Sequence, residues 1–220
     1  AWLADLAARI RQAERPVILA GQELAKYGCF EQTGELAELI GAPVYLESVP
    51  YNTRFPTNHR ANMGEITRNQ HKVLETLSAY DLLICLGADL LRMSPKAVVE
   101  PLPVGMPVVH ISERDWELGK NYWTEVALNA NVADTLDALL PVLRAQQTET
   151  DLAQAKQRLQ AAEPNNWLAN RARFIAATEQ KASASPTHPD YAVWQVVQAL
   201  PTHTMLVDET LTTNPSLYKL

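Results

Sequence analysis

The chain has 220 residues with a formal net charge of −6, and 47% of the residues are hydrophobic. These values are typical of a globular protein with a buried core and exclude a disordered or collagen-like chain. The acidic balance argues against a nucleic-acid surface, which needs a basic stripe. No apolar run approaches the length of a transmembrane helix.

The two ends of the sequence are typical of a segment cut from a longer chain. The sequence opens with Ala1, directly in an amphipathic pattern and without a basic-then-apolar signal peptide. Residues 215–220 have the pattern of a helix that has just begun. We therefore expect both ends to be cuts.

The first elements alternate between strand and helix. An apolar run at 16–21 ends in glycine, which indicates a buried parallel strand. Residues 30–40 have helical spacing with Gly41 as C-cap, and 43–48 is predicted to be a second strand. Residues 49–68, with several Pro and Asn, are expected to be irregular.

The middle of the chain continues this alternation. The elements predicted here are a helix over 69–79, strands at 81–87, 107–113 and 124–129, and a helix over 131–144 capped by Asn131. Strands separated by helices imply parallel pairing through right-handed crossovers. The expected fold class is therefore α/β, a Rossmann-like doubly wound parallel sheet of about six strands. The strand at 81–87 is apolar on both faces and should be central.

The character of the sequence changes after residue 144. Residues 145–182 predict one or two surface helices, 183–189 a linker, 190–200 a helix and 204–209 a further buried strand. The expected domains are 1–182, with trailing helices, and 183–220, a linker and the start of a truncated next domain. Because the rest of its sheet is missing, the strand at 204–209 should pack on the first domain or pair with a neighbouring molecule.

Ligands of doubly wound sheets bind at the carboxyl ends of the strands, so the strand-end loops are the first candidates. Gly21–Gly28 has glycines at both ends but no GxGxxG, and Glu23 places a negative charge where a pyrophosphate would lie. This pattern favours a degenerate, non-binding relative of the dinucleotide fold. The segment Gly87–Arg92 could approach a nucleotide, although a tight turn is the commoner explanation.

Histidines and cysteines offer no clear catalytic or metal site. His110 lies inside an apolar strand and His59 in a turn-rich loop, so both are interpreted as structural. Cys29 and Cys85 form no CxxC pair, which is typical of core residues of a reduced, cytoplasmic protein. There is no HExxH, P-loop or nucleophile elbow. The residues alone therefore predict an α/β domain of unknown ligand.

Five segments together point to a family, and they are 15–21, 40–45, 55–59 with Met63 and Gly64, 80–87, and 108–112. In order and spacing they resemble the central domain of thiamine-diphosphate enzymes, the group of acetolactate synthase, pyruvate decarboxylase and benzoylformate decarboxylase. The resemblance covers 1–145 and resumes over 186–220. There, 205–213 is similar to the strand that opens the diphosphate-binding domain, nearest to the benzoylformate decarboxylase branch.

The resemblance implies a parent enzyme that uses thiamine diphosphate and Mg²⁺ to decarboxylate or ligate a 2-oxo acid. In such enzymes the activating carboxylate and the metal motif lie in other domains, and the cofactor lies between two subunits. The resemblance thus implies a scaffold fragment that is inactive alone, with no catalytic residue or metal ligand of its own. Its partners would be the rest of its chain, sister subunits of a homo-oligomer and a small 2-oxo acid, without nucleic acid or membrane.

The only cofactor contacts implied by the resemblance are Thr210, Leu211 and Thr212, near the diphosphate. They would offer backbone N–H groups and two hydroxyls. Leu211 departs from the family's usual Ser or Thr and can offer only its backbone.

Two alternatives remain open. The chain could be an autonomous nucleotide-binding domain in which Gly21–Gly28 and Gly87 contact FAD or ADP. It could also be a free-standing NAD-dependent enzyme such as a deacetylase, which would need catalytic His and Asn in defined loops. The poor glycine loops favour the family branch whose central domain holds no nucleotide.

Overall fold

The computed structural model describes residues 2–48, 55–93, 97–209 and 213–220. The chain divides into two compact units, Ala1–Asn166 and Trp167–Leu220. None of the helices within these described ranges is both long and apolar enough to span a bilayer.

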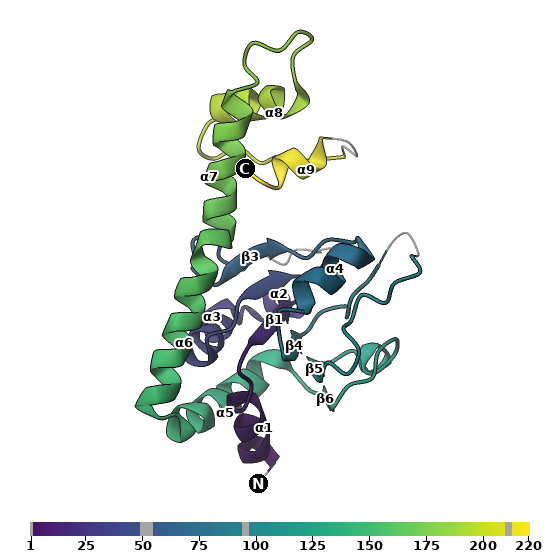
Figure 1. Ribbon diagram of the computed structural model, residues 1–220, viewed down its shortest axis with the longest axis vertical. Coiled ribbons are helices and arrows are strands. Elements are labelled where there is room, and N and C mark those ends of the chain that lie inside the picture. Colours follow the sequence, from purple (N-terminus) through teal and green to yellow (C-terminus); the bar gives the residue numbers. More distant parts are fainter. Residues whose placement is uncertain (1, 49–54, 94–96, 210–212) are drawn as a thin grey trace. The chain divides into compact units, whose positions relative to one another are not determined.

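The first unit is built on a six-stranded parallel sheet in the order β3-β2-β1-β4-β5-β6 (Figure 1). Its strands are β1 (Pro16–Ala20), β2 (Val44–Leu46), β3 (Asn62–Glu65), β4 (Leu82–Leu86), β5 (Val108–Ser112) and β6 (Val126–Asn129). This is the strand order of a doubly wound dinucleotide-type fold. The predicted fold class is confirmed, and so is the central place of the strand at 81–87, because β4 pairs with both β1 and β5.

Helices cover both faces of the sheet. The helices of this unit are α1 (Trp2–Arg11), α2 (Glu23–Tyr27), α3 (Phe30–Ile40), α4 (Gln70–Leu77), α5 (Val132–Gln146) and α6 (Glu149–Ala162), with 3-10 turns η1 (Asp115–Glu117) and η2 (Glu163–Asn165). One hydrophobic core joins α1, α3, α5 and α6 to alternate strand residues such as Ile18 and Ile84. The other joins α4 to the intervening residues, such as Val17 and Leu83. Strands with apolar residues on both faces are therefore buried on both.

The predicted helix ends are confirmed by their caps. Asn69 and Asn131 each accept a hydrogen bond from a backbone N–H three residues on. Gly41 adopts a left-handed conformation with φ of 65°, and its N–H donates to the Ala37 carbonyl. The predicted caps Asn131 and Gly41 are therefore confirmed, and Asn69 caps a helix that the pattern placed at about this residue.

Two elements differ from the sequence-based expectation. β3 lies in the segment that was expected to be irregular, because its four residues, Asn62 to Glu65, form no apolar pattern. Within it, the Asn62 side chain accepts a hydrogen bond from the Gly64 N–H. Backbone pairing with β2, not an apolar pattern, defines this edge strand. α2 has only five residues, too few for a helical pattern to be recognised.

The second unit consists of α7 (Trp167–Glu179), α8 (Pro189–Ala199) and α9 (Asn214–Leu217). Within it, the Lys181 ammonium lies 2.6 Å from the Asp190 carboxylate, near the start of α8. The division at Asn166 places α7 with α8 and α9. The domain boundary near residue 183 rests on the linker composition of residues 183–189 and stays a prediction.

The prediction of a buried strand at 204–209 is wrong. These residues form no strand, and Met205 and Val207 are almost fully exposed. A parallel strand needs the backbone groups of a neighbouring strand, and the described part of this unit contains none. Leu206 nevertheless lines an apolar pocket with residues of α8, so the segment has apolar contacts within its own unit.

Candidate functional site

The candidate site lies at the carboxyl ends of β1, β4 and β5. In this strand order the winding reverses between β1 and β4, and ligands of such folds bind in the crevice at that point. Gly21 follows β1 and Gly87 follows β4, while Ser112 is the last residue of β5. The predicted loops Gly21–Gly28 and Gly87–Arg92 are thus brought together.

The glycines at this edge allow two turns to touch each other. A Cβ on Gly21 would lie 2.1 Å from the Ala88 Cα, and a Cβ on Gly87 would lie 2.3 Å from the Glu23 Cβ. The Gly21 N–H donates to the Leu86 carbonyl at 2.9 Å. In dinucleotide sites glycine lets the backbone approach a pyrophosphate. Here the space beside both glycines is filled by protein.

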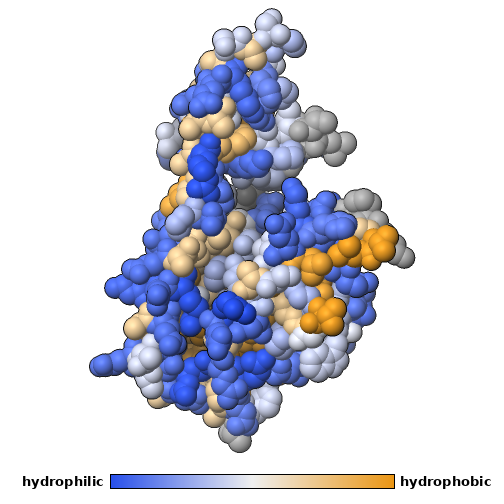
Figure 2. All heavy atoms as spheres, in the orientation of Figure 1, coloured by the Kyte–Doolittle hydropathy of each residue, from blue (hydrophilic) through white to orange (hydrophobic). Residues whose placement is uncertain are grey.

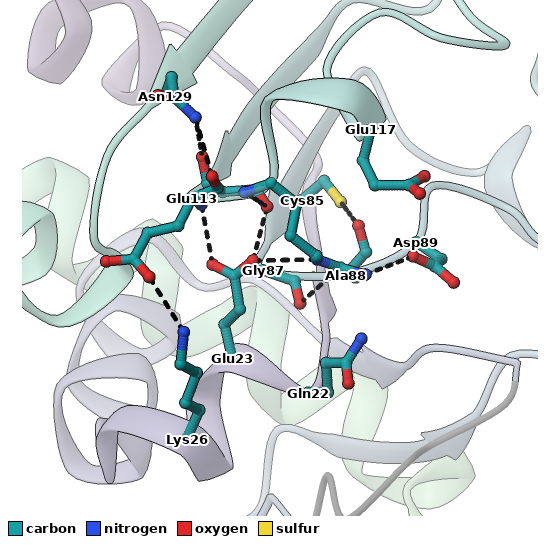
Figure 3. Close-up of polar contacts among 12 residues, drawn as sticks. Gln22, Glu23, Lys26, Cys85, Gly87, Ala88, Asp89, Glu113, Glu117 and Asn129 are labelled. Atoms are coloured by element: carbon teal, nitrogen blue, oxygen red, sulfur yellow. Dashed lines mark hydrogen bonds and ion pairs between the residues drawn. The ribbon is translucent and has the colours of Figure 1, made fainter.

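The Glu23 side chain is directed into the crevice and is 3% exposed (Figure 3). Its carboxylate accepts hydrogen bonds from Ser112 Oγ at 2.6 Å, the Glu113 N–H at 3.1 Å and Arg114 Nε at 3.1 Å. A buried carboxylate needs such donors to offset its lost hydration. The negative charge that the sequence placed at this loop therefore occupies the crevice itself.

Arg114 links the acidic residues of this edge. Its Nη1 lies 2.6 Å from Asp89 Oδ1, and its Nη2 donates to the Gly87 carbonyl at 3.2 Å. Burial alone would lower the pKa of Arg114, but Glu23 and Asp89 outweigh burial and raise it. Arg114 is therefore a permanent cation held between two carboxylates.

The Glu47 carboxylate, directly after β2, accepts hydrogen bonds from two backbone N–H groups at this edge of the sheet. Its two carboxylate oxygens accept from the Gln22 N–H at 2.8 Å and the Asp89 N–H at 2.9 Å. Burial raises the pKa of Glu47 to about 7, against the effect of these backbone N–H groups. Backbone N–H groups at strand ends are the usual donors to bound phosphate. In this chain the N–H groups of Gln22 and Asp89 are already paired.

A fourth carboxylate, that of Glu113, lies beside Asn131, the N-cap of α5. It accepts from Lys26 Nζ at 3.2 Å (Figure 3). It also accepts from the Tyr27 hydroxyl and from Asn131 Nδ2 at 3.0 Å. The positive end of a helix favours an anion. In this chain the anion near the start of α5 is the carboxylate of Glu113.

The two histidines singled out in the sequence are structural in their contacts. His110 is fully buried, with Nε2 3.2 Å from the Ala88 carbonyl, and burial lowers its pKa. His59 Nδ1 accepts from the Ala61 N–H at 3.2 Å, and its ring packs on Phe55. Neither faces an arrangement of nucleophile and base.

Cys29 and Cys85 are both free and buried. Burial raises the pKa of Cys29 to about 11 and that of Cys85 further. Neither thiol is activated. Over the ranges that the structure describes, no group of three His, Cys, Asp or Glu residues could hold a metal ion.

Thr210, Leu211 and Thr212, the predicted cofactor contacts, lie outside the described residues. On either side of them, Asp208 and Thr213 line an apolar pocket of about 250 Å³ in the second unit. Their role at a diphosphate stays a prediction.

Exposed apolar side chains lie on the connections that follow β4 and β5. Val98 and Val104 are completely exposed, and Trp116 and Trp123 are more than half exposed. Figure 2 shows a mostly hydrophilic face on which hydrophobic side chains gather beside the connection after β4. Exposed apolar groups of this kind often mark contact surfaces.

The sequence pointed to Glu23 and to both glycine turns, including the turn that holds Asp89, but not to Glu47, Ser112 and Arg114. Their positions in the sequence could have identified these residues, because each lies at the end of an apolar strand or shortly after one. In a parallel sheet all such positions converge on one edge.

Residues 3–139 match the family described as thiamine pyrophosphate enzyme, central domain. The chain is 27% identical to benzoylformate decarboxylase of Pseudomonas aeruginosa, over 66% of this chain and 27% of that protein. It is 31% identical to the large subunit of acetolactate synthase isozyme 1 of Escherichia coli, over 64% of this chain and 25% of that subunit.

A solved structure has a similar fold over nearly the whole chain. The crystal structure of benzoylformate decarboxylase from Polynucleobacter necessarius matches 99% of this chain and 37% of that one, with a TM-score of 0.79 and 19% identity. The chain spans about a quarter of the length of the curated relatives described above. With the family match covering more than half of its residues, the chain belongs to the thiamine pyrophosphate enzymes, as their central domain.

Proposed function

We propose that this chain is the scaffold domain of a longer thiamine-diphosphate- and Mg²⁺-dependent enzyme that acts on a 2-oxo acid, by non-oxidative decarboxylation or carboligation. The observation that supports this most is the family match over residues 3–139, together with relatives named benzoylformate decarboxylase and acetolactate synthase. The chain alone is expected to show no turnover.

The residues of the chain fit a structural role better than a catalytic one. When bound, thiamine diphosphate supplies the ylid and the electron sink for the carbanion left after loss of carbon dioxide. The carboxylates at the strand ends are paired with Ser112, Arg114, Lys26 and backbone N–H groups. The proposed site residues toward the cofactor are Thr210, Leu211 and Thr212, through their backbone and hydroxyls. The activating carboxylate and the metal ligands are proposed to lie in other domains.

A nucleotide-binding role is less well supported. A pyrophosphate at the β1–β4 crevice would meet the carboxylate of Glu23, and the N–H groups of Gln22 and Asp89 already donate to Glu47. Equilibrium dialysis with FAD and ADP distinguishes the two roles, since a scaffold domain should show no saturable binding.

The proposed partners are the remaining domains, sister subunits of a homo-oligomer and the 2-oxo acid. Exposed Trp116, Trp123, Val98 and Val104 support a contact surface on this domain. We place the enzyme in the cytoplasm on the basis of the two unpaired, buried cysteines.

The test is carbon dioxide release by the full-length enzyme from a panel of 2-oxo acids that includes pyruvate and benzoylformate. Release should require added thiamine diphosphate and stop when EDTA removes the divalent metal. The 220-residue chain, assayed in parallel, should release none. Release that continues without the cofactor would contradict the proposal.

A further inference from the structure

Ser112, Glu113 and Arg114, at the end of β5, each donate a hydrogen bond to the same carboxylate, that of Glu23. Ser112 Oγ and Arg114 Nε donate to one oxygen of the Glu23 carboxylate, at 2.6 and 3.1 Å, and the Glu113 N–H donates to the other at 3.1 Å. A hydroxyl, a backbone N–H and a guanidinium are the donors that proteins use to bind oxyanions. The donor set is therefore an anion-binding arrangement in its own right.

The acceptor comes from a different part of the chain. Glu23 belongs to α2 and lies 89 residues from Ser112 in sequence. Both side chains are buried, with Ser112 at 0% exposed and Glu23 at 3%. The three donors come from one short segment, and among the described residues the carboxylate that accepts from all three is that of Glu23.

The donors of the site need an acceptor at this position. Arg114 contacts two carboxylates, those of Glu23 and Asp89. Without Glu23, the guanidinium keeps one carboxylate partner while Ser112 Oγ and the Glu113 N–H lose their acceptor. A buried donor without an acceptor is costly, so a small anion entering the space would be stabilised.

We propose that Ser112, the Glu113 N–H and Arg114 form an oxyanion-binding site, and that the Glu23 carboxylate occupies it from within and keeps free carboxylate and phosphate ions out. Glu23 thereby acts as the specificity-determining residue of the crevice. This assignment goes beyond the proposed function and is independent of it, since it concerns anion binding and not turnover.

The variant Glu23→Ala tests the assignment. It retains the Cβ that packs on the Gly87 turn and removes one methylene with the carboxylate, a space suited to formate or inorganic phosphate. Thermal unfolding of the intact chain is followed at pH 7.5 in sodium chloride, sodium formate and sodium phosphate of equal ionic strength. The midpoint of the variant should rise by about 3 °C or more in formate or phosphate relative to chloride.

Three controls accompany this variant. The wild type should show a much smaller rise, because its site is occupied. Glu75→Ala, which removes an exposed charge from α4, should behave like the wild type. Glu23→Gln fills the same space as glutamate and should show no anion-specific rise.

The outcomes decide the proposal. An equal rise in Glu23→Ala and Glu23→Gln would mean that the anion binds elsewhere, and the proposal would fail. No rise in Glu23→Ala with either anion would also overturn it. If Glu23→Ala folds in none of the three salts, no free anion can replace the carboxylate, and the site is then a fixed ion pair only. Failure in any of these ways leaves the decarboxylation assay unaffected.

Discussion

The buried carboxyl of Glu47 predicts a specific dependence of stability on pH. Its pKa is about 7 in the folded chain, against an ordinary value of 4.5 when exposed in the unfolded chain. Between these two pH values the folded state holds a proton that the unfolded state has released. Unfolding then releases a proton, so the contribution of Glu47 to stability is fully present below pH 4.5 and falls as pH rises to about 7.

The magnitude follows from the two pKa values. The shift from 4.5 to about 7 corresponds to about 3 kcal/mol of unfolding free energy, lost at up to about 1.4 kcal/mol per pH unit. Other carboxyls oppose this trend, since hydrogen bonds from Lys181 and Ser216 lower the pKa of Asp190. The effect of Glu47 must therefore be measured as a difference between variants.

The assay is urea unfolding of the wild type and Glu47→Gln from pH 4.5 to 8. Glutamine has nearly the shape of glutamate but does not titrate. Its side chain can accept from only one of the two N–H groups, and this loss adds a constant, pH-independent offset to the difference in unfolding free energy. The free energy of unfolding of the wild type minus that of the variant should fall by about 3 kcal/mol across this range. The exposed Glu75→Gln variant serves as the control and should leave the difference flat. A difference for Glu47→Gln that is also flat would refute the reasoning.

Four further outcomes are expected. Gly21→Ala should destabilise the chain by more than about 2 kcal/mol in urea unfolding, because its Cβ would lie 2.1 Å from backbone and the turn must shift. Gly28→Ala, where φ is +65° but no atom lies within 4 Å, should cost only about 1 kcal/mol, and equal costs would contradict this account of the crevice. Cys29 and Cys85 should react with a thiol reagent such as dithiobis-nitrobenzoate only after unfolding, so labelling of the native chain would show that their burial is wrong. Leu136→Ala, at a fully buried position of α5, should lower the unfolding free energy by 2–5 kcal/mol, and a smaller loss would indicate that the core relaxes around the cavity.

The sequence was informative where local pattern determines structure. The run at 81–87 is apolar on both faces, which only a central parallel strand satisfies, and Asn69, Asn131 and Gly41 mark helix ends by their own chemistry. β3 could not be predicted in this way, because its polar residues are held by pairing with β2.

The site was predicted only in part. Glu23 could be placed at the crevice because it follows the first strand within a glycine-bounded loop. Its pairing with Arg114 spans 91 residues and depends on how β1, β4 and β5 align in the sheet. When strand pairing brings together two residues that are far apart in the sequence, no local sequence pattern predicts their contact.

The wrong prediction of a strand at 204–209 shows that an apolar pattern alone is not sufficient to predict a buried strand. Met205, Leu206 and Val207 satisfy the composition of a buried strand. Composition supplies the apolar side chains but not the neighbouring backbone. In this chain Met205 and Val207 are exposed, while Leu206 and Asp208 line an apolar pocket beside α8.

The central claim is that this domain supports a cofactor site whose essential groups lie elsewhere. Calorimetric titration with thiamine diphosphate and Mg²⁺ tests it most directly, on the 220-residue chain and on the full-length enzyme under the same conditions. We predict saturable binding to the full-length enzyme and no binding to the chain alone. Micromolar binding of the cofactor to the chain alone would contradict the claim.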